Sequence, residues 1–474
     1  MNAAARASLD VVILAAGKGT RMRSSLPKVL HRLAGLTLLE HVIRSAQALN
    51  PGSIHVVYGH GGEQVPERLG HLGVQWVKQE PQLGTGHAVQ QAMPGISAQT
   101  LLILYGDVPL TRVDTLRALV QAAGNSGMAL LTAELADPSG YGRIVRNAAG
   151  RVTRIVEHKD ASEAERAIRE INTGILLAPV ARLKQWLAAL GNNNVQGEYY
   201  LTDVIGMAAG EGQEIATARP QAEWEIQGVN SKSQLADLER THQRNQALAL
   251  MEQGVTLMDP ARFDLRGTLT CGQDVIIDVN VVIEGDVTLG DRVHIGPNNV
   301  LRHCKIGADT HVQPNCVIEN AEIGADCRIG PFARIRPETR IAERAHIGNF
   351  VEIKKSIIGV GSKVNHLTYV GDSTVGKDVN IGAGTITANY DGANKHHTQI
   401  EDNASIGSNC VLVAPVKIGA GATIGAGSVI AKEAPAGELT LSRAKQTTVP
   451  GWKRPVKAEK REKGKEESCT HRQY

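Results

Sequence analysis

The sequence predicts a protein of two domains, in which a mostly parallel α/β sheet is followed by a parallel β-helix. The first half alternates short apolar runs with helical patterns, and the second half repeats an aliphatic residue every six positions. The chain contains 50 glycines, more than the usual share of about 7%. Aromatic residues make up only 3% of it. Many small residues and few large rings favour a narrow solenoid as the second domain.

Length and charge narrow the class of protein. A chain of 474 residues exceeds one ordinary core, so two or three domains are expected. The formal charge of +3 is close to balanced and gives no basis for binding nucleic acid or a membrane surface. The first ten residues lack the apolar region of a signal peptide, and the six cysteines form no CxxC pair. We expect a cytoplasmic protein with reduced thiols and no membrane insertion.

The first half predicts a Rossmann-like domain over residues 1–230. Apolar runs at 11–14, 54–58, 101–105 and 128–132 read as strands, and helical spacing follows at 39–49 and 116–120. Such alternation is typical of a mostly parallel sheet covered by helices. Ligands bind such sheets at the carboxyl ends of the strands, and Gly17 and Asp107 both lie just past strand ends.

A linking helix and a solenoid are expected next. Residues 231–253 contain neither Pro nor Gly and read as one helix. From 254 to 452, aliphatic residues such as Ile277, Ile283 and Leu289 recur at six-residue steps, with occasional five-residue steps. Chance spacing in an ordinary sheet is the alternative, but the period returns in several separate stretches, and hexapeptide repeats are the signature of a parallel β-helix. Residues 388–399 are polar and interrupt the repeat, so we expect an extruded loop there.

The tail differs from both domains. Residues 453–474 are charged, mixed in sign and almost free of apolar side chains. Such a composition cannot bury enough surface to offset its conformational entropy. We expect this tail to be disordered.

The first candidate site is a glycine-rich turn after the first strand. Gly17 and Gly19 allow the backbone to approach an anion closely, while Lys18, Arg21 and Lys28 supply positive charge. Phosphoryl and nucleotidyl transfer need such charge, because negative charge develops on the transferred group. Most isolated G-x-G pairs are ordinary turns. The spacing matches neither the dinucleotide fingerprint G-x-G-x-x-G nor a Walker A loop, which argues against a dehydrogenase and a P-loop ATPase.

Asp107 is a candidate Mg²⁺ ligand. It ends the strand at 101–105, and Mg²⁺ binds through few protein oxygens while keeping waters or phosphates. An ordinary turn aspartate before Pro109 is the alternative interpretation, and it is the commoner case for an isolated residue.

A second candidate site is one for acyl transfer to an amine, a reaction that requires a base to accept the amine proton. Neutral histidine is the usual acceptor of the amine proton, and this chain has sixteen. His366 lies between two five-residue steps of the repeat, shortly after Lys354. His396 and His397 in the polar loop are rivals, and the residue pattern alone gives His366 only a modest advantage.

Several motifs carry a resemblance to a known family. They are residues 14–22 with Pro27-Lys28, Gln79, 84–88, 105–107, 140–143, 157–159, 172–174 and 228–230, together with the hexapeptide half and 366–369. Over residues 11–456 the chain resembles the bacterial bifunctional N-acetylglucosamine-1-phosphate uridyltransferase/glucosamine-1-phosphate N-acetyltransferases. The resemblance implies acetyl transfer from acetyl-CoA to glucosamine 1-phosphate, followed by uridylyl transfer from UTP with release of pyrophosphate.

The resemblance also implies roles in the first domain. Arg21 and Lys28 would stabilise the reacting phosphates, and Asp107 and Asn230 would bind Mg²⁺. UTP and UDP-N-acetylglucosamine would be held by Leu14, Ala15, Ala16, Gly17, Lys28, Gln79, Gly84, Thr85, Tyr105, Gly106, Asp107, Gly142, Glu157, Asn172 and Asn230.

Roles in the second domain follow in the same way, with His366 as the general base. Glucosamine 1-phosphate would be bound by Arg336, Lys354, Tyr369, Asn380 and Lys395. Acetyl-CoA would be contacted by Ala383, Asn389, Tyr390, Ser408, Ala426 and Arg443. The resemblance further implies that the β-helix is left-handed and forms a homotrimer.

Two other interpretations compete with the bifunctional enzyme. The solenoid could serve only to assemble or regulate a pyrophosphorylase, but the His366 motif and the loop argue against this. A non-catalytic scaffold is the third hypothesis, and Arg21, Lys28 and Asp107 argue against it.

Overall fold

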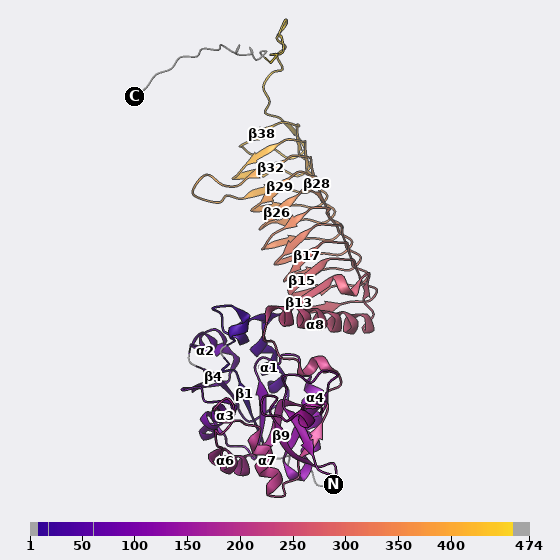
Figure 1. The fold of residues 1–474 in the computed structure, drawn as a ribbon. Helices are drawn as coiled ribbons and strands as arrows, with labels where there is room; N and C mark the ends of the chain where they lie inside the picture. The colour runs from indigo at the N-terminus through magenta and orange to yellow at the C-terminus, as the bar shows by residue number, and fades with distance from the viewer. Residues whose placement is uncertain (1–7, 18, 60, 458–474) are drawn as a thin grey trace, which may run out of the picture.

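The structure is a computed structural model that describes residues 8–17, 19–59 and 61–457. Figure 1 shows a rounded α/β domain, a helix lying across its top and a column of stacked coils above that helix. In the described part of the chain, no helix is both long and apolar enough to cross a membrane.

The first domain is built on a mixed, mostly parallel sheet with the strand order β11-β7-β10-β6-β1-β4-β5. The strands of this order are β11 (Ala216–Ala218), β7 (Ala129–Glu134), β10 (Glu170–Pro179), β6 (Thr100–Tyr105), β1 (Leu9–Leu14), β4 (Ile54–Gly59) and β5 (Gln75–Gln79). The predicted Rossmann-like class is confirmed. One strand was not anticipated: β10 runs antiparallel to both β6 and β7. Between β7 and β10 the chain forms a hairpin of β8 (Arg143–Arg146) and β9 (Val152–Val156) instead of a long crossover helix, so β10 enters the sheet in the opposite direction.

Helices and short 3₁₀ turns cover this sheet. The helices are α1 (Leu38–Gln47), α2 (Gln64–Leu69), α3 (Thr85–Ala92), α4 (Val113–Ala123), α5 (Glu163–Arg166), α6 (Val180–Ala188) and α7 (Asp203–Gly210). The hydroxyl and backbone N–H of Thr37 form a reciprocal capping box with Glu40 at the start of α1. The apolar side of α1 faces the buried strand residues Val11 and Ile13. These contacts hold the carboxyl ends of β1 and β6 in fixed positions.

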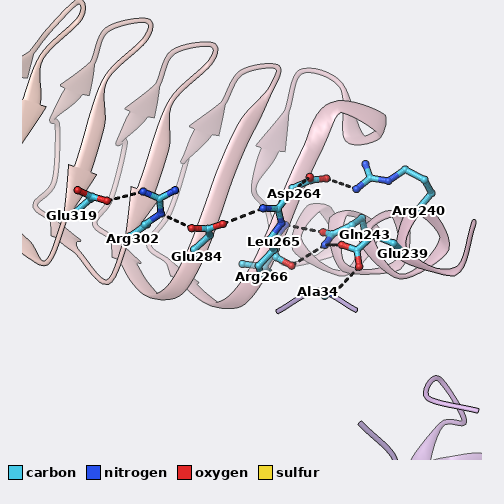
Figure 2. A network of polar contacts seen from close by, with 10 residues as sticks. All are labelled: Ala34, Glu239, Arg240, Gln243, Asp264, Leu265, Arg266, Glu284, Arg302 and Glu319. Atoms are coloured by element: carbon cyan, nitrogen blue, oxygen red, sulfur yellow. Dashed lines mark hydrogen bonds and ion pairs between the residues drawn. The ribbon is translucent and has the colours of Figure 1, made fainter. Parts of the chain in front are cut away.

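The predicted linking helix is α8 (Lys232–Glu252), and it is bonded to both domains. The Glu239 carboxylate accepts a hydrogen bond from the Ala34 backbone N–H at 2.6 Å. On the solenoid side, the Gln243 amide pairs with the backbone of Leu265, accepting from its N–H at 2.7 Å and donating to its carbonyl at 3.0 Å. Figure 2 shows that these contacts form one continuous network. Helix α8 is therefore a linker that is hydrogen-bonded to both domains.

A ladder of alternating charges continues this network along the solenoid (Figure 2). Arg240 and Arg266 both pair with Asp264 in the first coil, and Arg266 also reaches Glu284 at 3.0 Å. Arg302 then bridges Glu284 and Glu319. Each ion pair is only partly buried and stabilises little alone, but the chain of shared partners ties successive coils together.

The second domain is a left-handed parallel β-helix that runs from β12 (Thr256–Leu257) to β39 (Leu439–Thr440). Its strands pair in parallel with the coils before and after them. Aliphatic residues from successive coils stack inside the column and are fully or almost fully buried, among them Ile277, Ile295, Val312, Ile329 and Ile347. Each such side chain contributes roughly 1.5–3 kcal/mol of burial free energy. A single coil cannot bury its own residue, so the column is stable only as a stack.

The interruption of the repeat is an extruded loop, as predicted. It leaves the column after β32 (Ile386–Ala388) and returns at β33 (Thr398–Ile400), and Figure 1 shows it projecting from the side of the stack. Beyond β39 the chain is exposed and without helix or strand up to residue 457. Most of the tail for which we predict disorder, residues 458–474, lies outside the described residues.

The solenoid also contains free cysteines. Cys304, Cys316, Cys327 and Cys410 are buried among the described coils. Burial raises the pKa of the Cys304 thiol to about 12, so this thiol stays protonated at neutral pH. These cysteines act as small core residues.

Candidate active sites

The first site lies at the carboxyl ends of β1 and β6. The backbone N–H of Gly106 donates to the Leu14 carbonyl at 2.9 Å, which joins the two strand ends. A pocket of about 460 Å³ opens beside them. Its lining consists of Leu14, Ala15, Ala16, Gly17, Lys28, Val29, Gln79, Gln82, Gly84, Thr85, Ala88, Tyr105, Asp107 and Glu198. The structure thus brings ten of the predicted nucleotide residues into one pocket.

A basic side chain joins two oxygen donors at the edge of this pocket. The Lys28 ammonium lies 2.5 Å from Oδ2 of Asp107 and 3.0 Å from Oδ1 of Asn230. Lys28 and Asp107 are largely shielded from solvent. Asn230 directly precedes the N-cap of α8, and the Val229 backbone N–H donates to the Asp107 carbonyl at 2.9 Å. A carboxylate and an amide oxygen therefore converge on one cation.

The opposite wall of the pocket is built from β5 and the start of α3. Gln79 is buried at the end of β5, and its amide donates to the Gly84 carbonyl at 3.0 Å. Gly84 has φ of 109°, and a Cβ there would stand 2.7 Å from the Tyr199 carbonyl oxygen. Only glycine fits this turn. The Thr85 hydroxyl accepts from the Leu201 backbone N–H at 3.1 Å, which fixes the first turn of α3.

A second group of predicted residues lies where β8, β9 and β10 meet. The Asn172 N–H donates to the Gly142 carbonyl at 2.8 Å, and a Cβ on Gly142 would lie 3.5 Å from the Glu157 carboxylate. Burial raises the pKa of Glu157, although a hydrogen bond from the Thr202 hydroxyl, at 3.0 Å, opposes the rise. The Tyr105 ring lies over Gly174, and burial also raises the pKa of this phenol. A half-buried acceptor and an aromatic ring suit a neutral polyhydroxyl ligand.

Arg21 does not join this pocket. It is exposed on a short 3₁₀ turn, Thr20–Met22, whose buried residue is Met22. Lys18, the other basic residue of the glycine-rich turn, lies outside the described residues. Of the two predicted basic residues that the structure describes here, Arg21 and Lys28, it is Lys28 that lines the pocket.

Four of the predicted second-site residues lie at one corner of the solenoid, and a fifth, Arg443, lies at the upper end of that corner. The Gly384 N–H donates to the His366 carbonyl at 3.1 Å, and the Asn409 N–H to the Ala383 carbonyl at 2.7 Å. The Gly427 N–H donates to Ser408 at 2.8 Å. His366, Ala383, Ser408 and Ala426 are therefore stacked on successive coils, and we call them the corner column. Arg443 closes its upper end, with its side chain 3.7 Å from the Cβ that Gly425 would carry.

A polar cluster lies on a neighbouring stretch of the same coils. Arg336 pairs with Glu352 at 2.7 Å, and Glu352 and Tyr369 are register partners. The Lys354 ammonium is 3.9 Å from the Asp372 carboxylate. Asn389 donates hydrogen bonds to Asp372 and to the Tyr369 hydroxyl, the latter at 3.4 Å.

The remaining predicted residues lie apart from this cluster. The Lys395 ammonium stands 4.1 Å from the centre of the Tyr390 ring, within the extruded loop. Asn380 is exposed on β31 (Asn380–Ile381). The rival base His396 pairs with Asp391 at 2.6 Å inside the loop. Its partner is thus a residue of the loop itself.

Sequence reasoning missed several residues of both sites. Gln82 donates to the Ala16 carbonyl, Thr202 binds Glu157, and Asp372 links Lys354 to Asn389. Gln82 could have been found from its place between Gln79 and Gly84. Asp372 could have been suspected as an acidic residue one short step after Tyr369. Thr202 has no local signal, because only the fold brings it to Glu157.

Comparison with known proteins covers almost the whole chain. Residues 11–190 match the MobA-like NTP transferase domain, residues 265–346 the GMPPB C-terminal domain, and residues 397–432 the bacterial transferase hexapeptide with six repeats. The Bifunctional protein GlmU of Aromatoleum aromaticum is 61% identical over 450 residues, which is 95% of this chain and 99% of the relative. The proteins of that name from Ralstonia pickettii and Azoarcus sp. are 61% and 62% identical, each covering 95% of this chain and 100% of the relative.

A nucleotidyltransferase domain with a glycine-lined pocket, joined to a hexapeptide transferase solenoid, defines a bifunctional transferase. The chain belongs to the family of bifunctional GlmU proteins, and the resemblance seen in its motifs is confirmed. It is an enzyme with uridyltransferase and acetyltransferase activities.

Proposed function

We propose that the two activities form one route to UDP-N-acetylglucosamine. The solenoid transfers the acetyl group of acetyl-CoA to the amine of glucosamine 1-phosphate, and the α/β domain then transfers uridylyl from UTP and releases pyrophosphate. The observation that carries this proposal is the presence of two separate constellations, one at Lys28 and Asp107 and the other along the corner column.

In the first site, the sugar phosphate oxygen attacks the α-phosphorus of UTP directly. No protein nucleophile is needed, so the protein supplies position and charge. We assign the uridine and phosphates to the turn at 14–17 with Gln79, Gly84 and Thr85, and the sugar to Gly142, Glu157 and Asn172. Lys28 lines the pocket and neutralises phosphate charge. We keep Arg21 as a second cation, one that must turn in from its exposed position on ligand binding.

The residues fit a bound Mg²⁺. Oδ2 of Asp107 and Oδ1 of Asn230 already converge on one cationic group, the Lys28 ammonium. Two protein oxygens suit an ion that fills its other positions with waters and phosphates. When bound, Mg²⁺ would neutralise charge on the nucleotide phosphates. Lys28 would then be released toward the phosphates.

In the second site, His366 takes a proton from the attacking amine as it adds to the thioester carbonyl. The tetrahedral intermediate then collapses and coenzyme A leaves. We assign the sugar phosphate to Arg336, Lys354, Tyr369, Asn380 and Lys395. We assign acetyl-CoA to Ala383, Ser408 and Ala426 of the corner column, with Asn389, Tyr390 and Arg443. The basic residues match the phosphate of both ligands.

We further propose a homotrimer assembled through the β-helix and a cytoplasmic location. The exposed, stacked Phe332 and Phe350 rings on the coil corner, 5.2 Å apart, support a contact surface on the solenoid. The free buried cysteines suit a reducing compartment. We place the domain limits at 1–230, 231–253 and 254–452, consistent with the bounds of α8.

The test is to follow coenzyme A release and pyrophosphate release separately on the purified protein. Acetyl-CoA with glucosamine 1-phosphate should release coenzyme A, and UTP with N-acetylglucosamine 1-phosphate should release pyrophosphate in the presence of Mg²⁺. A protein that released pyrophosphate but never coenzyme A would instead support the alternative in which the solenoid only assembles the enzyme.

A further inference from the structure

A short hydrogen bond joins His366 to a residue without an assigned role. Nδ1 of His366 lies 2.6 Å from Oδ1 of Asn349. The two residues are register partners at the ends of β25 (His346–Asn349) and β28 (Lys363–His366). Asn349 is half-buried and His366 is exposed.

The coil repeat brings this pair together. Partners in neighbouring coils are 18 residues apart at Ile329 and Ile347, but 17 residues apart at Asn349 and His366. The five-residue step from Ile353 to Ile358 shortens the intervening coil. The Leu367 backbone N–H also donates to the Asn349 carbonyl at 3.1 Å, which locks the two coils together at this corner.

Asn349 lies one coil below His366, at the same corner of the solenoid as the corner column. On the three coils directly below Asn349, the same corner of the solenoid carries Pro331, Pro314 and Pro297. Proline offers no side-chain hydrogen bond and fills the corner with an apolar ring. The column therefore changes from proline to a hydrogen-bonding amide at the coil directly beneath the histidine.

An asparagine oxygen can only accept a hydrogen bond. Nδ1 of His366 must then carry the proton, and in the neutral ring Nε2 keeps its lone pair for the amine proton. A carboxylate at this position would also fix the tautomer, but its charge would stabilise the imidazolium. A neutral amide fixes the ring without adding that charge.

We propose that Asn349 is a positioning residue for acetyl transfer, which holds His366 in the tautomer and orientation that present Nε2 to the substrate amine. This inference rests on the proposed role of His366 as the base.

The test compares Asn349→Leu and Asn349→Asp with the wild-type protein. Asn349→Leu should lower kcat for coenzyme A release about 10- to 100-fold, part of the 10²–10⁴ that a positioned base contributes. The KM values of both substrates should stay within about twofold, because the proposal gives Asn349 no ligand contact. Asn349→Asp should recover most of the lost kcat, and its carboxylate should move the acid limb of the pH profile of kcat/KM to higher pH.

Controls separate this role from a loss of structure. Gln313→Leu removes an exposed amide two coils below and should change neither the rate nor the pH profile. Pyrophosphate release should be unchanged in all these variants because the α/β domain is untouched, and a thermal melting curve like that of the wild-type protein shows that the solenoid of each variant is folded. If Asn349→Leu destabilises the solenoid, the inference is tested by Asn349→Asp alone, through the pH dependence of kcat/KM for acetyl transfer.

Two results would overturn the inference. One is an Asn349→Leu enzyme with kcat within about twofold of wild type. The other is an Asn349→Asp enzyme with an unmoved pH profile. If His366→Ala itself retained acetyl transfer, the assignment of the base would fail instead, and the two failures are thereby distinguished.

Discussion

The two sites are assembled in opposite ways. In the α/β domain, Lys28 binds Asn230, which lies 202 residues away along the chain, and the sheet and α8 must both form before the two meet. In the solenoid, Asn349 and His366 are 17 residues apart and meet because one coil stacks on the next. A site made of distant segments depends on the whole domain, whereas a site made of neighbouring coils depends on local register. The four predictions below test this difference.

The largest effects should come from removing one group in each site. Asp107→Ala should lower uridylyl transfer roughly 10²–10³-fold, because the convergent oxygens near the phosphates are lost, and should spare acetyl transfer. His366→Ala should lower acetyl transfer roughly 10²–10⁴-fold and spare uridylyl transfer. Separate assays of pyrophosphate and coenzyme A release check both. Loss of both activities from a folded single variant would contradict the independence of the two centres.

A cavity in the column should damage only the neighbouring coils. Ile347→Ala removes a fully buried side chain two residues before Asn349 and should lower the free energy of unfolding by about 2–5 kcal/mol. Acetyl transfer should then fail at a lower temperature while pyrophosphate release is maintained. Ile277→Ala is the matched control, because it empties a similar buried volume four coils below Ile347 and far from His366. Equal loss of acetyl transfer in both variants would show that the stack responds as a whole.

A backbone clash should weaken the nucleotide pocket. Gly84→Ala forces a side chain onto φ of 109° and against the Tyr199 carbonyl, at a cost on the order of 1–3 kcal/mol. The KM for UTP should rise about tenfold, while coenzyme A release stays unchanged. Gly61→Ala, also at positive φ but with open space around its Cβ, is the control for strain alone. An unchanged KM would show that this turn adapts.

The smallest effect concerns the linker helix. His242 on α8 packs edge-on against His41, and burial lowers the pKa of His242 to about 4. The folded protein then binds this proton less readily than the unfolded chain, so the stabilisation is complete above about pH 6.5 and is lost as pH falls toward 4. Between pH 7 and pH 5 the wild-type melting temperature should fall by a few degrees more than that of His242→Gln. An equal fall in melting temperature in the two proteins would show that His242 does not make the stability of the linker helix depend on pH.

Sequence patterns predicted the solenoid and the gathering of the first-site residues around one pocket, for a physical reason. Each coil has the same local period. The six-residue spacing of Ile277 and the other buried aliphatic residues therefore predicts the solenoid directly. The glycine turn and Asp107 follow strand ends, and strand ends meet at one edge of a parallel sheet. The antiparallel direction of β10 was not predicted, since it depends on a hairpin in place of a helix.

Other contacts could not be predicted from residue spacing alone. Whether Asn349 or its neighbour faces His366 depends on each five- or six-residue step between them, and a one-residue error would move the partner. Thr202 reaches Glu157 only through the packing of α7 on β9. Arg21 was expected beside Lys28 and lies exposed instead, because Met22 anchors its short turn. Local patterns name the candidates, and tertiary packing decides which of them meet.

The corner column has a fixed rise from coil to coil. Neighbouring strands are about 4.8 Å apart, so the three steps from His366 to Ala426 span roughly 14 Å. This fixed spacing would let the corner column select an elongated acyl donor by its length. In the proposed site, a donor whose thioester lay beside His366 would extend along the corner column, and a donor of a different length would not reach the same residues at both ends.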